Sequence, residues 1–177
     1  MEQRWLAVLM AAFGLTATLC APTRSVAQEE HRATLTAIKE VLTCFSGGSG
    51  DFVAVIRPGE TAIDYQLSYE NLSGTVTQAH IHFGKRFEQG GIVAFLCSNV
   101  TPPPPDLPAN TPACPVPSGV VTGTLDASSI IGRASGQGIN AGELNKVIDA
   151  IQFRAGFTYA NVHSSLCPGG EIRGQIK

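Results

Sequence analysis

Charged residues are scarce in this sequence, and neither sign is in large excess. They make up 15% of the 177 residues, and 12 Lys and Arg face 14 Asp and Glu, which gives a formal net charge of −2. This balance excludes a strong polyanion binder, so we expect no nucleic-acid partner. A phosphate-loop lysine and the strand-to-helix context of a nucleophile elbow are also missing. The sequence therefore predicts no catalytic residue and favours a non-enzymatic protein.

A long apolar segment occurs near the N-terminus, where residues 5–20 follow the basic residue Arg4. Polar residues come next, and then the sequence SVA at 25–27, whose small-x-small pattern is typical of a signal peptidase site. The apolar segment has the length of a signal sequence rather than of a stable membrane span. We therefore expect residues 1–27 to be a signal peptide and residues 28–177 to be secreted, to the extracellular space or the periplasm.

Four cysteines follow the expected cleavage site: Cys44, Cys97, Cys114 and Cys167. An even number of cysteines in an exported chain predicts two disulfides, for which three pairings are possible. Cys97 and Cys114 flank the Pro-rich segment 98–113, which cannot form a strand or a helix, so a bridge between them would close the base of a loop. That bridge would leave Cys44 to pair with Cys167. Four buried free thiols are the alternative.

Glycine and proline are frequent, with 19 and 11 residues, and they separate short segments in which apolar and polar residues alternate. Alternation with a period of two is typical of strands with one buried face. We predict eight strands, near residues 32–43, 51–57, 61–70, 75–83, 91–97, 119–125, 156–163 and 170–176. This pattern indicates an all-β protein, an antiparallel sandwich or flattened barrel.

The segment between the sixth and seventh predicted strands departs from the alternation. Its apolar residues recur at i, i+3, i+4 and i+7, at Leu144, Val147, Ile148 and Ile151. This spacing predicts a short amphipathic helix over residues 141–152, with Asn140 as its cap. A further turn is expected over residues 127–131, where Asp126 can cap. Both would cover one end of the sandwich.

Three histidines are the candidate metal ligands. In the fourth predicted strand, alternation places His80 and His82 on the face opposite the apolar residues, toward solvent, and it treats Asn161 and His163 in the same way. Three neutral imidazoles around an open position suit Cu(II) or Zn(II). We predict that the ring nitrogens of His163 approach those of the pair to roughly 4 to 5 Å, as a shared ion requires. The alternative is that each histidine only donates to Glu171, a backbone carbonyl or water.

Four stretches resemble successive motifs of the CHRD domain, which is named after chordin: LTAIKEV at 35–41, AHIHFG at 79–84, GFTYANVHS at 156–164 and PGGEIRGQI at 168–176. Their order extends the resemblance over about residues 32–177. The Pro-rich segment 98–113 departs from the family pattern, and we interpret it as a local insertion. The resemblance implies an immunoglobulin-like β-sandwich or barrel similar to that of copper,zinc superoxide dismutases. It implies no settled activity, and the bone morphogenetic protein partners of chordin are not expected for a single-domain secreted chain of microbial type.

The resemblance to the dismutases also implies metal ligands. In that family an H-x-H strand and a later V-H pair bind copper, and these positions resemble His80, His82 and His163. No histidine lies between Phe83 and Val162, so the bridging and zinc-site histidines are absent. The resemblance therefore implies a degenerate copper or zinc site without full dismutase activity.

The last predicted strand alternates Glu171 and Arg173 with apolar residues, which gives it a charged outer face. These two residues, together with Asn161, are candidates to orient the metal-binding histidines. A surface ion pair between Glu171 and Arg173 is the alternative that we favour, and we interpret Glu40 in the same way. Glu171 also stands where the dismutases carry an arginine near the metal, which argues against attraction of an anion.

Two functions follow from the sequence. The first is a secreted, disulfide-stabilised CHRD domain that acts without catalysis, as a structural module of the cell envelope or by binding an unknown extracellular ligand or protein. The second is a copper- or zinc-binding protein that uses His80, His82 and His163.

Overall fold

The computed structural model describes residues 29–177, and the expected signal peptide at 1–27 lies outside the described residues. Eight strands form one antiparallel sheet: β1 (Glu30–Thr36), β2 (Ser49–Ile56), β3 (Ile63–Glu70), β4 (Val76–Phe83), β5 (Gly91–Ser98), β6 (Gly119–Leu125), β7 (Thr158–Ser164) and β8 (Ile172–Gln175). Their order across the sheet is β5-β4-β7-β8-β1-β2-β3-β6. All eight predicted strands are present, and the all-β antiparallel class is confirmed.

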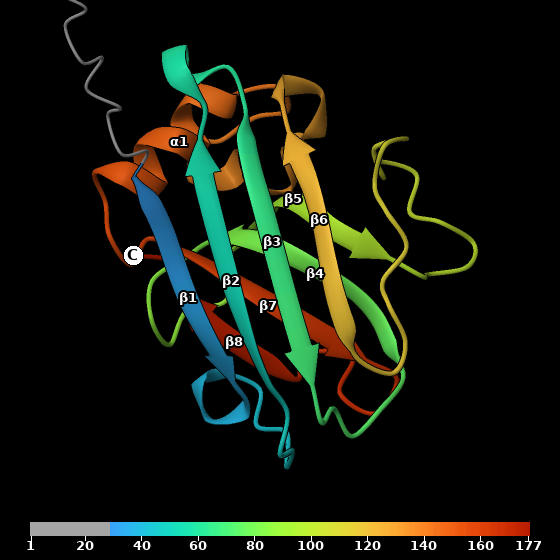
Figure 1. Ribbon diagram of the computed structural model, residues 1–177. Coiled ribbons are helices and arrows are strands. Elements are labelled where there is room, and N and C mark those ends of the chain that lie inside the picture. The colour runs from blue at the N-terminus through green and yellow to red at the C-terminus, as the bar shows by residue number, and fades with distance from the viewer. Residues whose placement is uncertain (1–28) are drawn as a thin grey trace, which may run out of the picture.

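The sheet curls into two layers (Figure 1). Strands β1, β2, β3 and β6 form the front layer, and β8, β7, β4 and β5 lie behind it. The layers are joined where β1 meets β8, through the register pair Thr36 and Arg173. β5 and β6 end the strand order and do not pair with each other within residues 29–177, so the barrel is nearly closed.

Alternation decides which side chains fill the space between the layers. In β3 every second residue is buried, namely Ile63, Tyr65, Leu67 and Tyr69. The rear layer contributes Ala79 and Ile81 from β4 and Ala160 and Val162 from β7 to the same core. The opposite faces of β4 and β7 are therefore free to carry polar side chains.

The first strand is shorter than the sequence predicts. β1 ends at Thr36, and a 3-10 turn over Ala37–Lys39 follows instead of a strand that reaches residue 43. The alternation of buried and exposed side chains does not continue into this turn, since Ile38 is 91% exposed. The turn brings the Glu40 carboxylate against Gly170, whose φ of +123° is a backbone conformation that favours glycine.

The helix α1 (Leu144–Gln152) begins three residues later than predicted. Asn140 does not cap it: the Asn140 backbone N–H instead donates to the Glu143 carboxylate over 2.7 Å. Gly142, with a φ of +81°, breaks the helical path before the first turn. The predicted apolar face is confirmed, because Leu144, Val147, Ile148 and Ile151 are buried.

Short 3-10 turns complete the connections. Asp126 caps Ala127–Ser129, as predicted, by accepting from the Ser129 N–H over 3.1 Å. A second turn at Gly132–Gln137 and a third at Pro58–Glu60 were not predicted. The Gly132–Gln137 turn is relevant to the site because it carries Arg133 toward the rear layer.

The described residues contain two disulfides. Cys97 pairs with Cys114 at the base of the Pro-rich loop, and Cys44 pairs with Cys167, which precedes β8. Two disulfides in one domain are typical of exported proteins. Within residues 29–177, no helix is both long enough and apolar enough to cross a membrane.

Candidate metal centre

The three candidate histidines lie on two neighbouring strands of the rear layer. β4 pairs with β7 so that His80 faces Asn161 and Gln78 faces His163 in the register. His80 and His82 point away from Ala79 and Ile81, which are in the core, so the predicted alternation is confirmed.

The predicted exposure of these histidines is wrong, however. His80, His82 and His163 are only 0%, 7% and 8% exposed. The segment that follows β4 and the connection that precedes β8 cover this face, and they contribute the carbonyl groups of Gly90 and Pro168 to it. A period of two assigns a side chain to a face of a sheet, but it does not indicate whether another segment covers that face.

The ring nitrogens of the three histidines converge. One ligand atom from each of His80, His82 and His163 lies within 4.8 Å of the others. The shortest approach is 3.2 Å, between His80 Nδ1 and His163 Nε2. The predicted approach of His163 to the pair is therefore confirmed.

Backbone carbonyls determine which nitrogen two of the histidines can offer. The Nδ1 atoms of His82 and His163 lie 2.9 Å from the carbonyl oxygens of Gly90 and Pro168. A carbonyl only accepts hydrogen bonds, so both Nδ1 atoms carry the proton and both Nε2 atoms keep a lone pair. His82 Nε2 is buried and has no hydrogen-bond partner.

The cluster is electrically neutral in this environment. Burial lowers the pKa of His82 to about 4, although its hydrogen bond to the Gly90 carbonyl opposes the shift. Burial, and then the neighbouring His163 and His82, lower the pKa of His80 well below its usual value. Burial also lowers the pKa of His163. Neutral imidazole is the form that binds metals, so at pH 7 no proton has to leave these rings before an ion binds.

A cavity of about 360 Å³ opens onto the cluster. The charged and aromatic side chains that line it, next to His82 and His163, are Glu40, Arg133, Tyr159 and Arg173. Burial raises the pKa of Glu40, while the positive charge of Arg173 opposes the increase. His80 does not line this cavity and packs behind it, with its ring edge-on to Phe95 at 4.7 Å between centroids.

Aromatic stacking connects this cavity to β8. The Tyr159 ring stacks on His82, with ring centroids 4.6 Å apart and planes within 5°. On Tyr159 lies the Arg173 guanidinium, 3.3 Å from the ring centroid. His82 is therefore held by a hydrogen bond from Nδ1 to the Gly90 carbonyl and by stacking of its ring on Tyr159. Neither interaction uses Nε2, which can bind an ion.

The family of the chain is established by comparison with known domains. The sequence model of the CHRD domain family matches residues 31–176. The chain belongs to the CHRD domain family. No curated protein and no solved structure matches the chain. The resemblance that the sequence motifs indicated is therefore confirmed over nearly all of residues 29–177.

The residues expected to orient the histidines of the CHRD domain behave differently from one another. The Asn161 amide nitrogen lies 2.9 Å from His163 Nε2 and so contacts the cluster directly. Arg173 has no contact of this kind and instead packs on Tyr159, whose ring stacks on His82. Glu171 does not line the cavity; it accepts hydrogen bonds from Ser46 Oγ over 2.6 Å and from the Ser73 N–H.

The prediction that Glu171 and Arg173 form a surface ion pair is wrong. Both residues are buried, and they do not form an ion pair among the described residues. The error has the same physical origin as for the histidines, because the outer face of β8 is covered by other segments. Glu40, interpreted from the sequence in the same way, is partly buried at the cavity and not in a surface ion pair.

Sequence reasoning missed Tyr159 and Arg133 as parts of the site. Tyr159 lies on the same face of β7 as Asn161 and His163, so alternation could have identified it. Arg133 comes from a turn that is distant in sequence, and no local signal indicates its position. Arg133 adds a second guanidinium group to that of Arg173, which the sequence had offered as a candidate, at this cavity.

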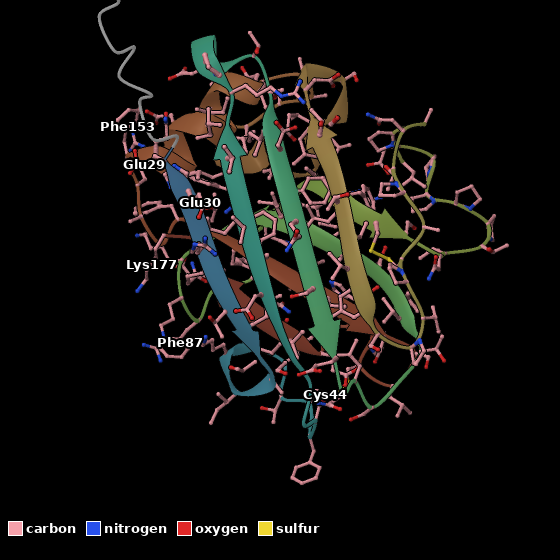
Figure 2. The ribbon with its side chains drawn as sticks, in the orientation of Figure 1. Glu29, Glu30, Cys44, Phe87, Phe153 and Lys177 are labelled. Carbon is pink, nitrogen blue, oxygen red and sulfur yellow. A yellow bond between two sulfur atoms is a disulfide. The ribbon has the colours of Figure 1, made fainter. Side chains whose placement is uncertain are left out.

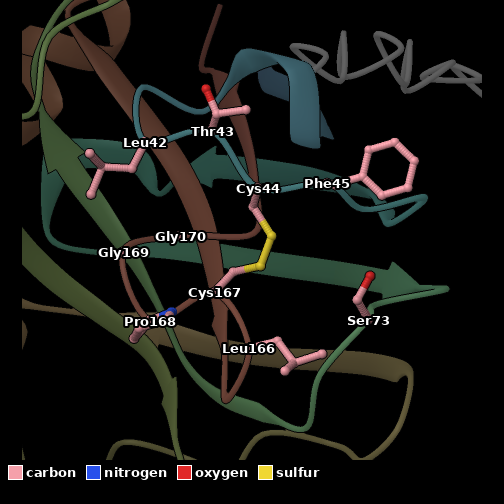
Figure 3. A pocket seen from close by; sticks show the side chains of 10 residues that line it. All are labelled: Leu42, Thr43, Cys44, Phe45, Ser73, Leu166, Cys167, Pro168, Gly169 and Gly170. Carbon is pink, nitrogen blue, oxygen red and sulfur yellow. A yellow bond between two sulfur atoms is a disulfide. The ribbon is translucent and has the colours of Figure 1, made fainter.

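One disulfide supports the segment that positions His163. Cys167 immediately precedes Pro168, whose carbonyl accepts the hydrogen bond from His163 Nδ1. Figure 3 shows Cys44 and Cys167 beside Pro168 and Gly169. The bridge therefore links the covering segment of the cluster to the chain that follows β1.

Proposed function

We propose that the protein is an exported, non-catalytic CHRD module that binds one copper or zinc ion through His80, His82 and His163. The observation that supports this proposal is the convergence of three imidazole nitrogens within 4.8 Å, on rings that are neutral at pH 7. The buried Nε2 of His82 has no hydrogen-bond partner, and a buried polar atom of this kind is costly unless a ligand satisfies it.

The donor set fits a transition metal. Metal–nitrogen bonds of 2.0–2.1 Å in a three- or four-coordinate site place ligand nitrogens about 3.3 to 3.6 Å apart. The separation of 3.2 Å between His80 Nδ1 and His163 Nε2 is close to this range, whereas other separations in the cluster reach up to 4.8 Å and have to shorten when an ion binds. His80 has no carbonyl partner that fixes its proton, so this proton can reside on Nε2 and leave Nδ1 for the ion.

Copper is the ion that we favour. Imidazole sites generally bind Cu(II) more tightly than Zn(II), and three histidines leave a position open. When bound, copper would supply one-electron chemistry at that position, and zinc would supply a Lewis acid. The amide of Asn161 lies at the same nitrogen of His163 as the ion would, so Asn161 has to release that nitrogen on binding.

We further propose that the nearly closed barrel is of the immunoglobulin-like type found in copper,zinc superoxide dismutases. The positions of His80 and His82 on one strand and of His163 on a later one support this assignment. The chain has four histidines in all, and the fourth, His31, is on β1, so a second metal bridged by histidine is not expected. Full dismutase activity is therefore not expected either.

Metal titration of the purified protein tests the proposal. We expect one equivalent of Cu(II) per chain by calorimetry and elemental analysis, with nitrogen hyperfine structure in the electron paramagnetic resonance spectrum. Loss of a ligand in His82→Ala or His163→Ala should weaken binding by at least about 100-fold. His31→Ala removes a buried histidine outside the cluster and should bind as the parent does.

Circular dichroism would verify that each variant folds. If the folded parent protein binds no copper or zinc, or if the His82 and His31 variants bind equally, the metal proposal is wrong. A structural or ligand-binding module without a metal would then remain.

A further inference from the structure

A second cavity, of about 480 Å³, lies next to the metal-binding face and is lined by five basic residues. We call it the basic pocket, and its charged residues are Arg32, Lys39, Arg86, Arg173 and Lys177. No acidic residue lines it. Figure 2 shows Lys177 and Phe87 along the edge of the molecule beside β1, and Arg86 precedes Phe87 in the sequence.

The basic pocket concentrates positive charge in a protein that is slightly acidic overall. Residues 29–177 contain ten Lys and Arg, and half of them line this one cavity. Outside it, four of the other five are paired with carboxylates: Arg57 with Asp64, Arg133 with Asp106, Lys146 with Glu143 and Arg154 with Asp149. In the pocket only Arg32 has an ion pair in the described chain, with Glu30.

Nearby carboxylates reduce this positive charge only in part. Glu40 and Glu88 act on Arg173 electrostatically but form no ion pair with it. Asp51 accepts a hydrogen bond from the Thr34 hydroxyl at the rim. With Glu30, Glu40, Asp51 and Glu88 all counted against the five basic residues, one positive charge remains in excess.

Arg173 provides a second, independent indication of an anionic ligand. This side chain is only 2% exposed, and burial of a guanidinium without a carboxylate partner is unfavourable. It donates to the carbonyl oxygens of Glu88 and Lys85, each over 2.8 Å, and to Gln175 Oε1 over 3.0 Å. These contacts hold the guanidinium in place at the pocket, but all of them are to neutral acceptors.

We propose that the basic pocket binds an acidic sugar, a pyranose-sized ligand that carries a phosphate, sulfate or carboxylate group. Its volume lies within the range typical of small-molecule sites and greatly exceeds the size of a free oxyanion. Arginine and lysine supply the charge-assisted hydrogen bonds that oxyanions require. Thr34, which also lines it, has a hydroxyl that donates to Asp51 and can still accept a hydrogen bond from a sugar hydroxyl.

Binding at the basic pocket does not depend on the metal centre. The two sites share Arg173, which lines both cavities, but the anion contacts proposed here involve no histidine. Metal-free protein is therefore the appropriate sample, and the result is independent of the outcome for copper.

Backbone amide chemical shifts in a nuclear magnetic resonance titration test the inference. We expect saturable shifts at Lys39, Arg86 and Gln175 with glucose 6-phosphate or glucuronate, and none with glucose. Inorganic phosphate should bind at least tenfold more weakly than glucose 6-phosphate.

Two charge-matched double variants identify the site. Lys39→Gln with Arg86→Gln should weaken glucose 6-phosphate binding at least tenfold. Lys146→Gln with Arg154→Gln removes the same charge from an exposed site elsewhere and should leave binding unchanged. Absence of saturable shifts with both acidic sugars, equal binding of inorganic phosphate, or equal weakening in both double variants would overturn the proposal.

Discussion

Single hydrogen bonds decide what several buried side chains can do. The carbonyls of Gly90 and Pro168 assign the protons of His82 and His163, so two rings present the same nitrogen, Nε2, to a common point. Neither carbonyl can be identified from a side-chain pattern, because any residue supplies one. The candidate ligands are therefore visible in the sequence, whereas the nitrogen that each would offer to an ion is not.

Tyr65 illustrates the same principle in the core. Its hydroxyl donates to the carbonyl oxygen of Leu96 over 2.6 Å and thereby links β3 to β5. The register of β4 with β5 shifts at this point, between the pairs that involve Phe95 and Cys97, so Leu96 has no register partner in β4. The Tyr65 hydroxyl compensates for this irregularity.

Removal of this hydroxyl in Tyr65→Phe should lower the free energy of unfolding by about 2 kcal/mol, because a buried carbonyl loses its donor. Tyr69→Phe is the matched control: its hydroxyl donates over 2.7 Å to the carbonyl oxygen of Pro115, a residue that is only partly buried, so water can replace the lost donor. We expect the control to lose less than about 1 kcal/mol in urea unfolding. Equal losses would show that the Leu96 contact has no special role.

At the level of elements, the site depends on strands that are distant in sequence. β4 and β7 are separated by two strands and a helix along the chain, yet they are neighbours in the sheet. The alternation within each strand is local and was predictable, as the faces of His80 and Ile81 demonstrate. The adjacency of the two strands, and the covering of their outer face, depend on the whole sheet.

The two disulfides should differ in their effects. Loop closure predicts about 3 kcal/mol for Cys97–Cys114, with a sequence separation of 17, and about 5 kcal/mol for Cys44–Cys167, with a separation of 123. We expect the Cys44→Ala/Cys167→Ala variant to be the less stable of the two in thermal unfolding. It should also bind copper more weakly, because Cys167 precedes the Pro168 that positions His163.

The Cys97→Ala/Cys114→Ala variant is the control for the metal site, and its copper affinity should equal that of the parent. If both double variants bound copper equally well while folded, the Cys44–Cys167 bridge would have no role in positioning His163.

At the level of the whole molecule, the buried neutral histidines connect folding to pH. The pKa of His82 is about 4 in the folded chain, against about 6.5 when unfolded. Between these values the unfolded chain binds more protons, so stability falls as the pH falls. The contribution of His82 to the free energy of unfolding is fully present above pH 6.5 and is lost as the pH falls toward 4. For His82 alone the loss is about 3 kcal/mol.

Urea unfolding of the metal-free protein between pH 7 and pH 4 measures this slope, and His82→Gln should flatten it. Glu40, whose pKa burial raises, acts in the opposite direction, but it is common to both proteins and cancels in the comparison. Asp64 and Asp106, whose pKa values are lowered by hydrogen bonds from Arg57 and Arg133, titrate below this range. Parallel pH profiles for the parent and the variant would contradict the assignment of the slope to His82.

The sequence by itself determined the eight strands, the apolar face of α1, the family and the three histidines, because periodicity and motif spacing are properties of consecutive residues. Only the tertiary structure decided that the histidines are buried, that Glu171 and Arg173 are separate, and that Arg173 joins two cavities. Burial and charge pairing depend on which distant segments cover a face of the sheet. That arrangement results from the closure of the barrel and the positions of its connections, which no local pattern encodes.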